Sequence, residues 1–248
     1  PREAYLLADK LTAPFFSSEA DIRPFFESQL KTCSVDYFDF YLMHAQNKEI
    51  FEKFKACRAY ETAFALKAEG KIRHVGLSFH DRADVLDMIL NTYPQVEFVQ
   101  LQLNYIDWDD PVVQSKLCYE VCRKHGKPVV IMEPARGGRL ADLPAAVAAP
   151  LLEARPDLSQ ASWAYRFCCN QPGVLTVLSG MSNLAQVEDN VSYMKQFKPL
   201  TEREEAVIAQ AKTILAQQKS IPCTACHYCM DGCPKKIPIP EIFSACND

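Results

Sequence analysis

Six short apolar runs, each followed by a segment with helical periodicity, limit the folds open to this chain more than any other feature. The runs are apolar throughout, which is typical of strands covered on both faces, whereas half-exposed strands alternate. They span residues 5–8, 37–43, 74–78, 98–104, 128–132 and 175–179. A β-α-β-α series of this kind predicts a parallel sheet with right-handed crossovers.

Cap residues mark the helices that we expect between these strands. Ser18 is expected to begin a helix that runs to Lys31, and Thr201 with Glu204 forms a capping box before a helix ending near Gln218. The other helices are expected over 60–70, over 82–91 after Asp81, from Pro111 in the first turn to Gly126, after Ser159, and over 184–194 after Asn183.

Two architectures satisfy this series: an open doubly wound sheet and a (β/α)8 TIM barrel. No Gly-x-Gly-x-x-Gly follows any predicted strand, and the chain has only 8 glycines, which favours the barrel. Such a barrel closes with eight strands. We therefore expect about six of eight βα units here, with about two N-terminal units absent, and an open six-stranded sheet as the alternative.

Charge and hydropathy exclude several classes of partner. The net charge is −4 and no basic run exceeds a dipeptide, which argues against nucleic acid. No apolar stretch approaches the ~20 residues that span a bilayer, and no signal-peptide pattern opens the chain. The chain has 11 cysteines, and six of them are scattered through helical patterns as buried thiols. We expect a cytoplasmic protein in a reducing compartment.

Four further cysteines form one run, residues 223–234 (CTACHYCMDGCP), with the spacing C-x2-C-x2-C-x3-C-P. This spacing is typical of bacterial [4Fe–4S] ligation and predicts Cys223, Cys226, Cys229 and Cys233 as metal ligands. A zinc site would favour two pairs with a longer spacer, and idle thiols are the remaining alternative. His227 inside the run is interpreted as a flanking residue.

The run leaves one question open, because in two-cluster ferredoxins the fourth cysteine of such a run binds the other cluster. Cys233 either completes a single cluster or serves a second one. The predicted organisation is a barrel over residues 1–200, a connecting helix over 201–220 and a small iron–sulfur segment over 221–248.

Lys10 and His44 stand near the ends of the first two predicted strands, where a barrel has its active-site mouth. With these residues the chain resembles the aldo/keto reductases, in the subgroup with a ferredoxin-like tail. Residues 5–10 (YLLADK) are similar to the strand with the active-site lysine, and residues 29–44 (QLKTCSVDYFDFYLMH) to the signature ending on the active-site histidine. Residues 70–78 (GKIRHVGLS) and 179–190 also resemble family segments.

The resemblance implies an oxidoreductase that transfers hydride between NADP or NAD and a small-molecule carbonyl or alcohol. It implies a tetrad of Asp, Tyr, Lys and His, in which Lys10 and His44 are the catalytic residues present here, while Asp and Tyr belong to the family's first two βα units. By the same resemblance the cofactor contacts Ser78, Gln100, Glu133, Pro134, Ala135, Gly137, Gly180, Met181, Ser182, Gln186 and Asn190.

Some positions depart from the family pattern. Phe79 replaces an Asn at the carboxamide, and Met132 replaces a Tyr that stacks on the nicotinamide. Gly180 and Gln186 replace basic residues that bind the 2′-phosphate, so NAD and NADP both stay open. The cluster would pass electrons, with a redox partner protein, or brace the tail. A non-catalytic or electron-transfer iron–sulfur protein on the same scaffold is the alternative, and substrate and oligomeric state are left open.

Overall fold

The structure is a computed structural model that describes residues 1–217, 221, 223, 228–231 and 233–247. By internal contacts the chain divides into two units. The first comprises Pro1–Gln102, Asp107–Met132 and Gly173–Thr176, and the second comprises Leu103–Ile106, Glu133–Pro172 and Val177–Asp248. The predicted division at residues 200 and 220 stays a prediction.

The predicted α/β class with a parallel sheet is confirmed. Six strands form one sheet in the order β1-β2-β3-β4-β5-β6, and the four pairs from β1 to β5 are parallel. The strands are β1 (Ala8–Leu11), β2 (Phe38–Gln46), β3 (Ile72–Phe79), β4 (Phe98–Gln102), β5 (Val129–Met132) and β6 (Val174–Val177). Sequential order without interruption is what successive right-handed βαβ crossovers produce.

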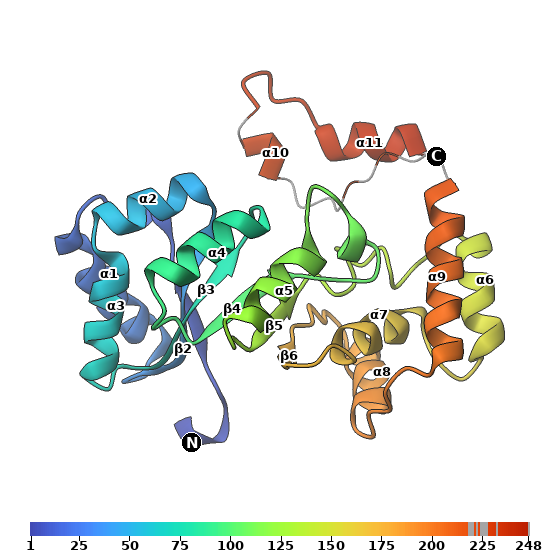
Figure 1. The fold of residues 1–248 in the computed structure, drawn as a ribbon, viewed down its shortest axis with the longest axis horizontal. Helices are drawn as coiled ribbons and strands as arrows, with labels where there is room; N and C mark the ends of the chain where they lie inside the picture. The colour runs from blue at the N-terminus through green and yellow to red at the C-terminus, as the bar shows by residue number, and fades with distance from the viewer. Residues whose placement is uncertain (218–220, 222, 224–227, 232, 248) are drawn as a thin grey trace. The chain divides into compact units, whose positions relative to one another are not determined.

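Helices alternate with these strands along the chain (Figure 1). The first unit contains α1 (Glu19–Cys33), α2 (Lys48–Ala56), α3 (Ala59–Ala68), α4 (Ala83–Thr92) and α5 (Ser115–Lys124). The second contains α6 (Ala145–Ala154), α7 (Gln160–Cys169), α8 (Leu184–Met194), α9 (Glu202–Gln217), α10 (Tyr228–Asp231) and α11 (Ile239–Asn247). None of the helices in the described part of the chain is long and apolar enough to cross a membrane.

Several predicted caps are confirmed atom by atom. The Asp21 carboxylate accepts hydrogen bonds from the amide and hydroxyl of Ser18, which completes a capping box at α1. The Asn183 side chain accepts from the Gln186 amide, and α8 has the predicted bounds. These side chains satisfy amides that the first helical turn leaves unpaired.

The start predicted for the helix at Pro111 is wrong. The Asp110 carboxylate accepts from the amides of Val112 and Val113 at 2.8 and 2.9 Å, which holds a turn, and α5 begins only after Gln114. Helices α2 and α6 were not predicted. The helix α6 contains Pro150, a residue that argues against a helix interior.

The first strand lies three residues later than predicted. The Asp39 carboxylate accepts from the Leu7 amide and pairs with Arg2 at 2.6 Å and Arg73 at 2.9 Å. This buried carboxylate holds residues 2–7 as a lead-in outside the sheet. In consequence Leu6 is 72% exposed, although its apolar character suggested a buried strand.

Close packing inside the first unit explains one glycine. Leu42, Phe98 and Val130, on β2, β4 and β5, form a buried cluster. A Cβ at Gly76 on β3 would lie 2.5 Å from the Phe98 ring, so only glycine fits at this point of the sheet.

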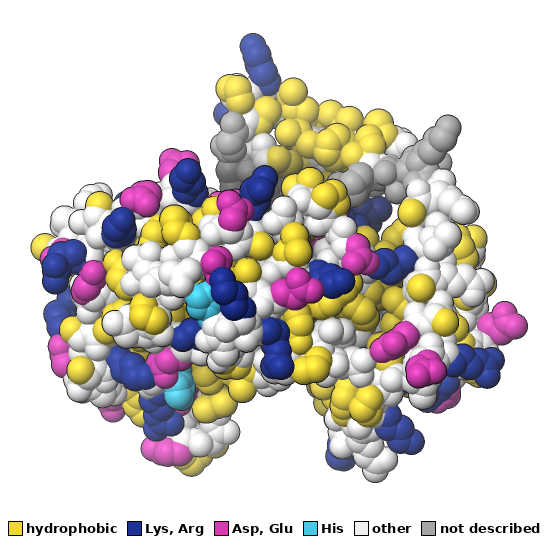
Figure 2. Space-filling view, in the orientation of Figure 1, with side chains coloured by type: hydrophobic (Ala, Val, Ile, Leu, Met, Phe, Trp, Pro, Cys, Tyr) yellow, Lys and Arg dark blue, Asp and Glu magenta, His cyan; other side chains and the backbone are white. Residues whose placement is uncertain are grey.

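A charged network stabilises the second unit beside its apolar core of α6, α7 and α9. Arg166, with a side chain 4% exposed, donates to the Glu204 carboxylate at 2.7 Å, and Arg155 approaches the same carboxylate at 3.1 Å. Glu204 also accepts from the Thr201 amide and hydroxyl, which confirms the predicted capping box. The hydrogen bond from Arg166 first, and then those from Thr201, lower the pKa of Glu204 to about 2. Elsewhere in this unit, apolar side chains gather at the surface of α11, where Ile242 is 44% exposed (Figure 2).

Replacing Glu204 by Ala is expected to lower the free energy of unfolding of this unit by about 3 kcal/mol, because Arg166 is left buried without its partner. Glu202→Ala, two residues earlier and exposed, is the matched control. Urea unfolding followed by Trp163 fluorescence in a Trp108→Phe background measures the difference. Equal losses in both variants would contradict this account of the network.

Candidate active site

Lys10 and His44 lie on neighbouring strands near their carboxyl ends. β1 and β2 pair in parallel with Lys10 opposite Leu42 and Leu11 opposite Met43. Because the carboxyl ends of parallel strands meet at one edge of a sheet, both side chains belong to the same edge. Lys10 and His44 are each half-buried.

Thr12 contacts the histidine directly, and the sequence analysis missed it. Its Oγ1 lies 3.0 Å from His44 Nδ1. A signal was available, because a residue two positions after Lys10 in an extended segment points to the same side of the sheet. Threonine is common in such segments, however, and nothing in the sequence alone singles this one out.

An irregularity at the end of β2 orients His44. The register between β2 and β3 shifts between Met43 and Gln46, and Ala45 adopts φ +52°, which costs energy for a residue other than glycine. The Ala45 amide donates to Ser78 Oγ at 2.8 Å, and the Gln46 side chain donates to the His44 carbonyl at 3.0 Å. These contacts hold the peptide bond that follows His44.

The surroundings favour a neutral imidazole. Burial, then the positive charge of Lys10, then His80 lower the pKa of His44 below its ordinary value. Burial also raises the pKa of the neighbouring Asp9 carboxyl. Among the residues that the structure describes, Lys10 takes part in no ion pair, so its ammonium group is not neutralised by a bound carboxylate.

Two predicted cofactor residues of the first unit, Ser78 and Gln100, are buried on adjacent strands and stand opposite each other in the β3–β4 register. Ser78 Oγ accepts the Ala45 amide, and Gln100 Nε2 lies 3.1 Å from Met132 Sδ. A thioether is a weak acceptor, so the Gln100 amide keeps capacity for a stronger partner.

The predicted pyrophosphate loop of the second unit is tightly turned. The Glu133 carboxylate accepts from the Gly137 amide at 2.8 Å, and its carbonyl accepts from Asn104 Nδ2 at 3.0 Å. Glu133, with φ +56°, and Gly137, with φ +63°, both have left-handed backbones. Pro134 is buried and Ala135 half-buried within the turn.

The predicted adenosine segment, also in the second unit, gathers at the N-terminus of α8. Gln186 Oε1 accepts from the Ser182 amide at 2.7 Å and hydroxyl at 3.2 Å, while Gly180 and Met181 beside them are exposed. Asn190 is set further back, where Nδ2 donates to Ser179 Oγ at 2.9 Å. The N-terminal turn of α8 is exposed, and the backbone amides at a helix N-terminus suit an anionic group.

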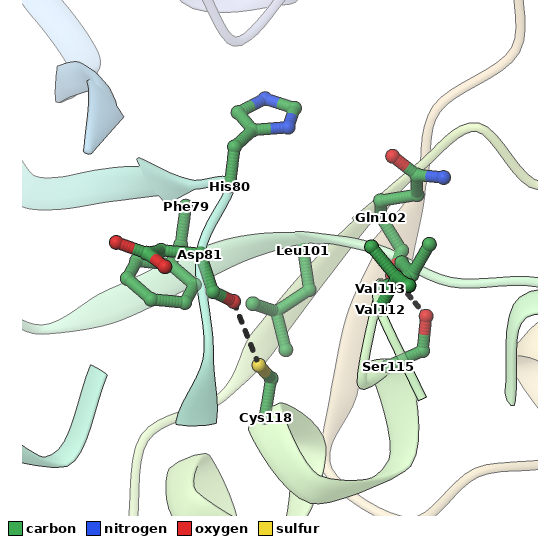
Figure 3. Close-up of a pocket in the computed structure, with 9 residues that line it drawn as sticks. All are labelled: Phe79, His80, Asp81, Leu101, Gln102, Val112, Val113, Ser115 and Cys118. Carbon is green, nitrogen blue, oxygen red and sulfur yellow. Dashed lines mark hydrogen bonds between the residues drawn. The ribbon is translucent and has the colours of Figure 1, made fainter. Parts of the chain in front are cut away.

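A separate small cavity of about 210 Å³ opens between the ends of β3 and β4 and the start of α5 (Figure 3). Phe79 and Leu101 form its apolar wall, and Cys118 Sγ donates to the Asp81 carbonyl at 3.6 Å. Burial raises the pKa of the Cys118 thiol to about 12, so it is not a nucleophile at neutral pH. Phe79, which departs from the family pattern, thus packs in the apolar wall of this cavity.

The cysteine run is described only in part, because Cys226 and His227 lie outside the described residues. No disulfide joins Cys223, Cys229 or Cys233 to another described residue, and no group of three or more metal-binding side chains gathers in the described part of the chain. Cys233 Sγ accepts the Ile237 amide at 3.5 Å. The amides of Ile237, Lys235 and Lys236 lower the pKa of Cys233, an arrangement that stabilises the thiolate form in which cysteine binds metals.

Comparisons with known proteins agree with this fold. The model of the aldo/keto reductase family matches residues 1–212. The aldo-keto reductase AKR11C1 from Bacillus halodurans in its holo form shares 24% identity at a TM-score of 0.65, over 85% of this chain and 73% of that one. An aldo/keto reductase from Klebsiella pneumoniae, in complex with NADP and acetate, shares 21% identity at a TM-score of 0.65, over 84% and 70%. No curated protein matches the chain significantly.

His44 is expected to have a pKa below its ordinary value of 6.5, and Lys10→Met should raise that pKa, because it removes a nearby positive charge. Burial would still hold the pKa below the ordinary value. NMR titration of the imidazole measures the pKa of His44 in the unsubstituted protein and in Lys10→Met. Lys31→Met is the control, because Lys31 is exposed on α1. Because the unfolded state takes up this proton first, the group lowers stability as pH falls below 6.5. A pKa unmoved by Lys10→Met would refute the coupling.

Proposed function

The chain belongs to the aldo/keto reductase family, and on that premise we propose that it transfers hydride between a nicotinamide cofactor and a small-molecule carbonyl or alcohol. Membership of this family makes it an oxidoreductase. The observation that carries the proposal is the placement of Lys10 and His44 at one edge of neighbouring parallel strands, with the charge of Lys10 lowering the pKa of His44.

In this proposal the two side chains act on the substrate oxygen in different ways. Lys10, without an ion pair in the described part of the chain, supplies a positive charge that lowers the pKa of a neighbouring proton donor. His44, neutral at physiological pH, donates a hydrogen bond from its ring to the carbonyl oxygen and orients it. Fixed donors of this kind stabilise the charge that develops on the oxygen during reduction.

The proposed cofactor, NADP or NAD, would supply the hydride. Ser78 and Gln100 would hold its carboxamide, and the Glu133 to Gly137 turn would line its pyrophosphate. The exposed turn of Gly180, Met181, Ser182 and Gln186, with Asn190 behind it, would bind the adenosine end, where helix amides suit a phosphate. NADP occupies the relative from Klebsiella pneumoniae, which supports this class of cofactor.

Two further βα units are part of the proposal, and they would supply the Asp and Tyr of the tetrad. The sheet has six strands in sequence order, whereas a barrel of this class closes with eight. The end strand β6 supports further pairing, because its Leu175 is 53% exposed. Apolar side chains at a sheet edge are typical of a surface that takes a neighbour.

The proposed reaction is tested in the full-length protein with Lys10→Met, which keeps the length of the side chain and removes its charge. Turnover of a carbonyl substrate with NADPH is expected to fall by roughly 10²- to 10⁴-fold, because proton transfer loses its supporting charge. The Kd for NADPH, from fluorescence titration, should stay within about twofold, since the ammonium acts on the reacting oxygen. Lys31→Met is the control. Unchanged turnover in Lys10→Met would refute the role of Lys10, and no turnover in the unsubstituted protein would favour a non-catalytic scaffold.

We also propose that the tail holds a [4Fe–4S] cluster on Cys223, Cys226, Cys229 and Cys233, which would pass electrons to a redox partner or brace the tail. The spacing of the run supports four thiolate ligands in one short segment. The amides around Cys233 Sγ support it further, because N–H donors stabilise a ligating thiolate.

Anaerobic purification of the full chain is expected to yield iron and acid-labile sulfide in equal amounts, on the order of four of each per chain. Cys229→Ser should lose both, since it removes a thiolate from the run. Cys246→Ser, outside the run in the same tail, should keep both. One zinc per chain without sulfide would refute the cluster assignment.

A further inference from the structure

The pairing of β1 with β2 places a hydroxyl at the catalytic imidazole. Leu11 stands opposite Met43, so the next residue along each strand brings Thr12 to His44. Their side chains meet at 3.0 Å between Oγ1 and Nδ1, a normal hydrogen-bond length. Both residues are half-buried, so water competes less for this bond than at an exposed site.

Thr12 is held where this bond needs it. It is the N-cap of the short 3₁₀ helix η2 (Ala13–Phe15), but its side chain makes no capping hydrogen bond, so the hydroxyl is left for the imidazole. Lys53 Nζ, from α2, donates to the Ala13 carbonyl at 2.6 Å and lies 4.9 Å from the centre of the Phe16 ring. The chain on the carboxyl side of Thr12 is thereby attached to a helix.

The backbone at His44 is held as well. The His44 carbonyl accepts a hydrogen bond from the Gln46 side chain, and the Ala45 amide donates to Ser78 Oγ. A neutral imidazole has one N–H and one bare nitrogen, and its partners decide which nitrogen keeps the proton. If Nδ1 carried the proton, it would donate to Oγ1, and the Thr12 hydroxyl proton would have no acceptor in the described part of the chain. If Thr12 donates, that proton is satisfied and Nδ1 is the acceptor.

We propose that Thr12 is a positioning residue that donates to His44 Nδ1 and thereby keeps the imidazole proton on Nε2. The inference rests on the proposed function, because an Nε2–H is what a carbonyl oxygen requires as a donor. In the other tautomer, Nε2 would present a lone pair to the lone pairs of the substrate oxygen. Thr12 therefore acts on the reaction only through His44 and touches no reacting atom.

Nitrogen NMR of the full-length protein tests the tautomer without any turnover. With ¹⁵N-labelled histidine, at a pH above the titration range, His44 should show a bare Nδ1 and a protonated Nε2, assigned by the loss of its signals in His44→Asn. Thr12→Val keeps the shape and removes the hydroxyl, so both resonances should move toward those of a tautomer mixture. Thr12→Ser should restore the wild-type pattern. Thr32→Val is the control, because Thr32 is exposed on α1.

A protonated Nδ1 in the unsubstituted protein would overturn the inference, and this result requires no variant to fold. Unchanged ring resonances in Thr12→Val would overturn it as well. In the full-length protein, Thr12→Val should lower kcat by roughly five- to tenfold, the value of one hydrogen bond, while the Kd for NADPH is unchanged and Thr12→Ser recovers kcat. A tautomer shift in Thr12→Val, in a full-length protein that turns over no carbonyl substrate with NADPH, would refute the proposed function and leave the hydrogen bond established.

Discussion

Parallel pairing of β1 with β2 is the constraint on which the candidate site depends. The register sets Lys10 opposite Leu42 and carries Thr12 to His44, so one choice of pairing positions three polar side chains. A shift of β1 by one residue along β2 would turn Lys10 and Thr12 to the other face of the sheet, away from His44. The buried Asp39 carboxylate, which binds Arg2 and the Leu7 amide, fixes the point at which β1 enters the sheet.

The end of β2 shows why a regular strand would not suffice. Ala45 takes a left-handed conformation that costs energy, and the Ser78 hydroxyl compensates by accepting its amide. The register shift that follows brings Gln46 to Tyr60 and anchors the strand to α3. Two hydrogen bonds, one partly buried and one buried, therefore hold the strained backbone directly after His44.

Much of the fold could be predicted, because apolar runs and caps act locally. Asn183 marks the start of α8, and its carboxamide makes the expected bond. The sequence misled where a tertiary contact prevailed: Asp39 delays β1, and the Asp110 turn delays α5. At the candidate site, Lys10 and His44 could be predicted from segments that resemble family signatures. The role of Thr12 depends on its contact with His44, which lies 32 residues away in the sequence. Motifs report residue types, and such a contact exists only once the strands have paired.

Arg139 ties two segments that are distant in the sequence. Its guanidinium donates to the carbonyl of Cys223 at 2.7 Å, directly after the turn that contains Glu133 and Gly137. The second unit thus closes a loop of more than eighty residues with one charged hydrogen bond. An insertion in that turn that moved Arg139 would break its hydrogen bond to the Cys223 carbonyl, at the first cysteine of the tail. A change in the length of the turn would therefore require a matching change in the segment that contains Cys223.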